Sequence, residues 1–288
     1  MTTAAAPMGA VGEPIKGPTA LGTSPERLLR LTWALAVTDF RLRFFGSVLG
    51  YAWSFMQPLM LFGVLYTVFS VLLDFGGAER YYPVALLLGI VLFSFFNEAT
   101  SGAVRSLVSR ENLVRKIEFP RLAVPLATVL TACFNLSLNL VPVTIFLVAS
   151  GGRPRWTWLE LPVLLVMLTV LATGVAMLLS ALFVRYRDIE PIWTVLLQIL
   201  FYVTPIFYTV TLVREKASES VVRLMMLNPF AAMLQQARYA FVDASHPSLG
   251  SAMGGTLWIV LPLLVTVVVC VGGYVVFSRA APRVAEEL

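Results

Sequence analysis

The chain has 288 residues, of which 58% are hydrophobic and only 13% are charged, and its 21 basic and 16 acidic residues give a formal net charge of +5. This composition is more apolar than that of a soluble globular domain, so the bilayer is the solvent of most of the chain. Each membrane crossing takes about 20 mostly apolar residues, which leaves room for several spans but not for a second soluble domain.

The first 23 residues are rich in Ala, Gly, Pro and Thr and lack the apolar core of a signal peptide. We expect residues 1–23 to be a disordered cytoplasmic N-terminus and residues 24–288 to form a single transmembrane domain. Ser24 can cap a helix, Pro25 suits its first position, and Glu26 complements the positive helix end. A helix is therefore predicted to begin here.

Polar and basic residues of this first helix fall near one helical stripe, and leucines and a tryptophan supply apolar surface around it. Its arginines are Arg27, Arg30, Arg41 and Arg43. The pattern is typical of an amphipathic helix that lies in the membrane interface. A cytosolic helix packed on its own protein is the alternative.

Six apolar runs follow and predict six transmembrane helices. They lie at about residues 54–73, 83–104, 122–149, 160–183, 190–209 and 256–278. Six crossings put both termini on one side, and that side holds fourteen of the 21 basic residues. Because Lys and Arg concentrate in short cytoplasmic loops, we expect a multi-pass plasma-membrane protein with both termini cytoplasmic.

Residues 211–255, between the last two spans, are too many for a tight turn and too apolar for a plain loop. Asn228-Pro229 is a turn signal that precedes a helical pattern. Apolar stretches of ten to fourteen residues have re-entrant or interfacial length. We expect one or two short helices that dip into the outer leaflet, with a surface amphipathic helix as the alternative.

No motif for binding nucleotide phosphates is present. Such a loop needs glycines followed by Lys and then Ser or Thr, and none of Lys16, Lys116 and Lys216 has these neighbours. Any ATP and Mg²⁺ must therefore be bound by a partner subunit, and we expect no cofactor in this chain.

The sequence also lacks the residues of common catalytic and metal sites. The single histidine, His246, precedes Pro247 in a polar loop, where we expect a solvated side chain. One histidine excludes multi-histidine metal sites and disfavours a catalytic triad, so we expect no catalytic residue and no metal.

Ionisable residues are scarce inside the spans. Only Glu98 stands clearly within an apolar run. It is either functional or satisfied by water or a neighbouring span, and both interpretations stay open. Because ion-driven transporters need intramembrane charges, an energy source within this chain is poorly supported.

The loop between the second and third spans mixes both charge signs with apolar residues. Leu113, Val114 and Ile117 share one helical face, which predicts a short helix able to dock its apolar side on a partner. A solvated basic loop is the alternative.

Four ordered segments resemble the permeases of the polysaccharide-exporter branch of ABC transporters. They are Arg43 to Ser54 with Gln57-Pro58-Leu59, Asn112 to Lys116 with Phe119-Pro120-Arg121, Val184 to Asp188, and Leu227 to Phe230. The resemblance covers the chain from about residue 25, and the Ala- and Pro-rich N-terminus departs from it.

The resemblance implies a homodimer of six-span subunits that engages two copies of a nucleotide-binding ATPase and exports a lipid-linked polysaccharide, such as an O-antigen, a teichoic acid or an arabinogalactan precursor. It implies a coupling helix to the ATPase at Glu111, Asn112, Leu113, Val114, Arg115 and Lys116. It also implies an external gate at Asn228, Pro229 and Phe230. We expect membrane lipid as a further partner and no nucleic acid.

Aromatic residues near the span ends could line a glycan path, since rings stack on the C–H faces of sugars. The candidates are Phe44, Tyr51, Trp53, Phe93, Phe96, Tyr202 and Tyr208. Interface anchoring is the default role of such rings. The alternative functions are an ABC exporter of a small hydrophobic drug or lipid, and a membrane-embedded glycosyl or acyl transferase, which would need a catalytic acid or base.

Overall fold

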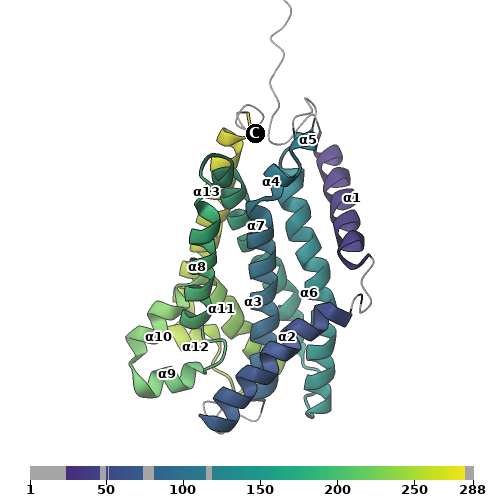
Figure 1. Ribbon diagram of the computed structural model, residues 1–288. Coiled ribbons are helices and arrows are strands. Elements are labelled where there is room, and N and C mark those ends of the chain that lie inside the picture. The colour runs from purple at the N-terminus through teal and green to yellow at the C-terminus, as the bar shows by residue number, and fades with distance from the viewer. Residues whose placement is uncertain (1–23, 46–49, 51, 74–80, 115–118, 283–288) are drawn as a thin grey trace, which may run out of the picture.

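A computed structural model describes residues 24–45, 50, 52–73, 81–114 and 119–282 (Figure 1). Within these ranges all regular secondary structure is helical, which confirms the prediction of an all-α membrane protein. The N-terminus predicted to be disordered lies outside the described residues.

The helices follow one another with short connections. Their bounds are α1 (Pro25–Phe44), α2 (Ala52–Leu65) with its π-helical extension η1 (Tyr66–Leu72), α3 (Tyr82–Val104), α4 (Ser106–Ser109), α5 (Glu111–Val114), α6 (Ala123–Ala149), η2 (Trp156–Leu159), α7 (Glu160–Arg185), α8 (Ile189–Val203), α9 (Val210–Lys216), α10 (Glu219–Met226), α11 (Pro229–Ala237), η3 (Arg238–Val242), α12 (Leu249–Met253), η4 (Thr256–Ile259) and α13 (Val260–Ala280).

Five helical segments of the described chain are long and apolar enough to cross a membrane. They are Ala52–Leu72, Tyr82–Val104, Ala123–Ala149, Trp156–Arg185 and Thr256–Ala280. The run predicted at 190–209 forms only the 15 residues of α8, or about 22 Å at 1.5 Å per residue, against a hydrocarbon core of about 30 Å. The count of six spans therefore stays a prediction.

A proline explains why α8 ends early. Thr204 precedes Pro205 and has extended backbone angles, φ −77° and ψ 137°. A proline ring disfavours the helical conformation of the residue before it, so the helix stops at Val203. The freed carbonyl oxygens of Tyr202 and Val203 accept hydrogen bonds from the Tyr208 hydroxyl, at 3.2 and 2.8 Å.

Helix α3 forms the centre of the bundle and packs on α2, α6, α7 and α8. In its most apolar window 78% of the residues are buried, against 6% for the α2 segment. Helix α2 therefore lies on the outside of the chain, where it crosses the bundle obliquely (Figure 1). Helices α9 to α12 gather at one end of the bundle, and α4 and α5 lie at the opposite end.

Helix α1 begins as its sequence predicts, because the Ser24 hydroxyl accepts a hydrogen bond from the Arg27 backbone N–H at 3.3 Å. It lies lengthwise against α6 (Figure 1), with Leu28 and Ala36 buried in the contact. One face is thus packed on its own protein, and the position of α1 in the membrane interface stays a prediction. Trp33, 58% exposed, is on the surface.

The segment between α8 and α13 contains four α-helices, so the prediction of one or two was too low. Amphipathic patterns this short do not reveal where the chain turns. Every residue of α11 except Gln236 is buried, and α11 packs against α7 and α13. Helix α10 lies on the surface, with Val222 and Met226 facing inward and Leu224 69% exposed. A buried helix and a surface helix both occur in this segment.

Candidate functional site: a polar groove between the long helices

Polar side chains recur at helical spacing on four long helices. Helix α3 carries Ser94, Asn97 and Ser101, at positions i, i+3 and i+7, which share one face. The matching pairs on the other helices are Ser54 and Gln57 on α2, Asn135 and Asn139 on α6, and Thr194 and Gln198 on α8. Polar stripes within apolar helices need partners, because hydrocarbon supplies none.

These stripes face two adjoining cavities. The larger, of about 550 Å³, is lined by Gln57, Pro58, Leu61, Phe93, Ser94, Asn97, Ser101, Thr194, Leu197, Gln198, Phe201 and Tyr202. The smaller, of about 240 Å³, is lined by Arg43, Ser54, Gln57, Pro58, Ser94, Asn97, Glu98, Ser101, Asn135 and Asn139. They share five lining residues, so we treat them together as the polar groove.

Two contacts hold α8 on α3 along one wall of the groove. The Trp193 indole N–H donates to the Thr100 hydroxyl at 3.1 Å. One turn before it, Glu190 forms an ion pair with Arg105 at 2.6 Å. These contacts orient Thr194 and Gln198 toward the cavity.

Glu98 lies at one end of the groove with its charge paired. One of its carboxylate oxygens accepts hydrogen bonds from Arg43 of α1 and from the Asn135 amide of α6, the latter at 2.5 Å. Asn139, one turn further along α6, donates to the Asn135 backbone carbonyl at 2.9 Å. The interpretation of Glu98 as a residue satisfied by neighbouring segments therefore holds, and Glu98 also lines the groove.

Aromatic rings lie toward the other end. Phe93 meets Phe201 edge to face, with ring centroids 5.0 Å apart, and both rings line the groove beside Tyr202. Two of the predicted path residues, Phe93 and Tyr202, are thereby brought together. The lining of the groove therefore offers hydrogen-bonding groups next to aromatic faces.

The other predicted path residues lie elsewhere. Phe96 is 3% exposed and packs between Trp193 and Phe230, so it lines no path in this conformation. Trp53 is 52% exposed on α2, and Tyr208 caps α8. Tyr51 and the Phe44 side chain lie outside the described residues.

The three predicted gate residues form the start of α11. The Asn228 side-chain oxygen accepts a hydrogen bond from the Phe230 N–H at 3.0 Å and caps the helix, while its amide donates to Thr204 beyond the end of α8 at 3.4 Å. Phe230 is 1% exposed and touches Phe93 with ring centroids 5.7 Å apart. Phe230 is thus a buried residue that packs against Phe93, one of the aromatic rings that line the groove.

The predicted coupling helix is seen only in its first turn, α5, because Arg115 and Lys116 lie outside the described residues. Val114 is fully buried in this chain's own core, so the expectation that this residue docks on a partner was wrong. The Val114 side chain belongs to the same buried hydrophobic cluster as Leu107 and Phe119. Polar Asn112 is exposed instead.

The arginines of α1 differ in their contacts. Arg30 forms an exposed ion pair with Glu26 at 3.3 Å. Arg43 pairs with Glu98, as described above, and Arg41 is exposed. Only Arg43 reaches the groove.

The expectation of a solvated His246 was wrong, since its exposed fraction is 5%. The loop that carries it folds back on the bundle: the Pro247 carbonyl accepts a hydrogen bond from Gln235 of α11 at 2.6 Å. Burial, helped by the positive charge of Arg238, lowers the pKa of His246 to about 4. The imidazole is neutral at pH 7.

Comparison with known proteins agrees with this architecture. The profile of the ABC-2 type transporter family matches residues 30–242, nearly three quarters of the sequence. The chain belongs to this family. It is a multi-pass membrane protein of the kind that forms the transport subunit of ABC transporters.

Relatives of this ABC-2 chain carry names from polysaccharide export. The O-antigen export system permease protein RfbA of Klebsiella pneumoniae is 26% identical over 254 residues, which cover 87% of this chain and 92% of that protein. A Myxococcus xanthus protein of the same name is 24% identical over 74% of this chain and 81% of its own length. The polysialic acid transport protein KpsM of Escherichia coli is 22% identical over 61% of this chain and 68% of its own length.

Reasoning from sequence missed most groove residues of this ABC-2 chain as site candidates, since it singled out only Arg43, Glu98, Phe93 and Tyr202 among them. The signal was nevertheless present, because Ser94, Asn97 and Ser101 recur at helical spacing inside an apolar run. A count of uncharged polar residues by helical face would have found them.

Proposed function

We propose that this chain is the membrane-spanning half of an ATP-driven exporter that moves a lipid-linked polysaccharide from the cytoplasm across the plasma membrane along the polar groove. The observation that carries the proposal is the groove itself, where polar stripes of α2, α3, α6 and α8 adjoin Phe93, Phe201 and Tyr202. The names of the relatives support the same class of substrate.

The chemistry of the groove suits a glycan better than a hydrophobic drug. Sugar hydroxyls lose hydration when they enter a membrane and need hydrogen-bond partners, which Asn97, Gln57 and Gln198 can supply. Aromatic faces complement the C–H faces of sugar rings. A pocket for a small hydrophobic compound is lined mainly by apolar side chains instead.

A second copy of the chain would complete the path. On α2 and α8, which border the groove, only Pro58 and Leu197 are buried, and both helices expose large apolar side chains. Apolar surface beside a polar groove suits a partner span better than bare lipid alone, because the partner would enclose the groove. We therefore propose a homodimer with the path between its subunits.

Energy would come from two copies of a separate ATPase subunit at the α4–α5 end. This end carries the segment that resembles the coupling helix of polysaccharide exporters. It would face the cytoplasm, together with both termini. The exposed Asn112 and the adjacent Glu111 would meet the ATPase through polar contacts, whereas Val114 anchors the turn in the bundle. ATP and Mg²⁺ would be bound by that partner.

Export of surface polysaccharide tests the proposal. We expect Asn97→Leu and Ser101→Leu to lower export at least about tenfold in cells that lack the parental gene, because each replaces a hydrogen-bonding group of the groove. Ser137→Leu is the matched control, since Ser137 is an exposed serine of α6 that does not line the groove.

Normal export by both groove variants would contradict the proposed path. Failure of the chain to co-purify with its cognate ATPase would contradict the exporter itself. Turnover of a lipid-linked donor by the purified chain alone would favour the transferase.

A further inference from the structure

Helix α1 carries two charged residues one turn apart that pair with different parts of the molecule. Asp39 forms an ion pair with Arg110, and Arg43 forms one with Glu98. Residues at i and i+4 share a helix face, so both pairs lie on the side of α1 turned toward the bundle.

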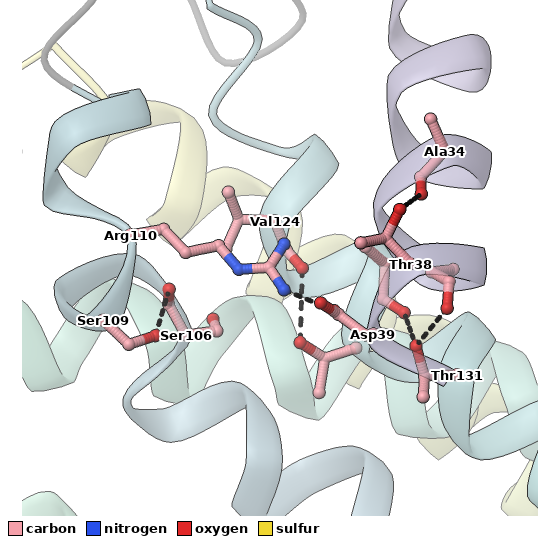
Figure 2. Close-up of polar contacts among 11 residues, drawn as sticks. Ala34, Thr38, Asp39, Ser106, Ser109, Arg110, Val124 and Thr131 are labelled. Atoms are coloured by element: carbon pink, nitrogen blue, oxygen red, sulfur yellow. Dashed lines mark hydrogen bonds and ion pairs between the residues drawn. The ribbon is translucent and has the colours of Figure 1, made fainter. Parts of the chain in front are cut away.

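The first pair ties α1 to the proposed coupling segment. Arg110 stands between α4 and α5, and its backbone carbonyl accepts hydrogen bonds from the N–H groups of Leu113 and Val114, at 2.9 and 3.1 Å. Its guanidinium meets the Asp39 carboxylate (Figure 2), and these side chains are 20% and 29% exposed. One residue thus holds the first turn of α5 through its backbone and α1 through its side chain.

The second pair ties the same helix to the polar groove. Arg43 and Asn135 share one oxygen of Glu98, and all three side chains line the smaller groove cavity. Ser101, one turn from Glu98 on α3, also lines it. Arg43 therefore occupies the α1 end of the groove while paired with Glu98.

A cavity of about 320 Å³ separates the two pairs. It is lined by Asp39, Arg43, Glu98, Gly102, Thr128 and Thr131. Thr131 of α6 also borders α1: its hydroxyl donates to the Ala127 carbonyl of its own helix at 2.9 Å and lies 3.3 Å from the Ala36 carbonyl of α1, so the hydrogen bond to α1 is the longer of the two. The cavity gives Arg43 room to move off Glu98.

We infer that α1 is the link through which the coupling segment opens the groove: motion of α5 displaces Arg110 and Asp39, and the rigid helix carries Arg43 away from Glu98. The inference rests on the proposed function. A helix transmits such a shift because Asp39 and Arg43 are joined by continuous backbone hydrogen bonds, about 6 Å apart along its axis. Two discrete arrangements of ion pairs are a common basis for switching.

Thiol labelling in the groove tests the link without knowledge of the substrate. The parent carries Ser101→Cys in a background with Cys133→Ser and Cys270→Ser, in complex with the cognate ATPase in nanodiscs. We expect a non-hydrolysable ATP analogue to change the labelling rate by a membrane-impermeant maleimide at least about fivefold. Asp39→Asn and Arg110→Gln should each bring this ratio close to one.

The charge swap Asp39→Arg with Arg110→Asp should restore at least half of the nucleotide response, which separates a broken link from a misfolded chain. Glu26→Gln is the matched control, because it removes an exposed ion pair of the same helix and should leave the response unchanged. A full response in Asp39→Asn and Arg110→Gln, or no recovery in a well-assembled swap, would overturn the link alone. No response in the assembled parent would overturn the proposed coupling to ATP, and the link with it.

Discussion

The contact between α7 and α13 depends on two glycines, and one substitution tests it. A Cβ atom added at Gly273 would lie 2.1 Å from the Gly174 carbonyl oxygen, 3.0 Å from its carbonyl carbon and 3.3 Å from its Cα. All three atoms are backbone, so no side-chain rotation relieves the clash. The Gly273→Ala variant must move α13 away from α7 by about 1.3 Å to bring the 2.1 Å contact to an ordinary 3.4 Å.

Separation of two packed helices loses dispersion contacts along their whole length. Overpacking in a tight interior costs about 1–3 kcal/mol, and a backbone clash belongs at the upper end of that range. Helices α7 and α13 form the most extensive helix pair of the described chain. We therefore expect Gly273→Ala to lower the free energy of unfolding by 2–3 kcal/mol.

Gly272 supplies a control on the neighbouring position. An added Cβ there meets no atom within 4 Å, and alanine favours helix over glycine by about 1 kcal/mol. Gly272→Ala should thus be neutral or slightly stabilising. Thermal unfolding of both variants in detergent measures the difference, and equal melting temperatures would refute the role of the glycine contact.

Three further predictions concern the α9–α12 end. Because the pKa of His246 falls from 6.5 to about 4 on folding, the folded state binds fewer protons, so stability should drop as the pH falls from about 6.5 to 4, by up to about 3 kcal/mol. His246→Gln should flatten this dependence in thermal unfolding, and an unchanged slope would contradict it. Tyr208→Phe removes the hydroxyl that caps α8 and should cost about 1 kcal/mol, visible as faster hydrogen exchange at its last turn, whereas unchanged exchange would exclude the cap. Arg238 is buried and donates to the Ile206 carbonyl at 2.6 Å; Arg238→Met should cost about 2 kcal/mol in thermal unfolding, and wild-type stability would show that the carbonyl needs no partner.

Much of the architecture could be predicted from local chemistry. Runs of apolar residues mark the long helices, and Ser24, Pro25 and Glu26 mark the start of α1 as the structure shows it. These features depend on residues that are close in sequence, so they can be predicted without knowledge of the fold. The early end of α8 at Pro205 is also a local signal, which the hydropathy of residues 190–209 concealed.

The site was harder to predict because its parts meet only in the folded chain. Arg43 and Glu98 are 55 residues apart in sequence, and Asp39 and Arg110 are 71 apart. Neither pairing follows from spacing. Phe96 shows the same limit in reverse, since an aromatic residue near a span end can be buried by packing rather than exposed to a path.

The sequence by itself determined that this is an all-α membrane chain without a nucleotide-binding motif, because composition and periodicity depend on the residues alone. Tertiary structure decided which polar faces meet, that Val114 and His246 are buried, and that α1 contacts both Arg110, between α4 and α5, and the groove. The physical reason is that hydrogen bonds and ion pairs inside a bundle depend on helix rotation and tilt. Packing of the whole chain sets both.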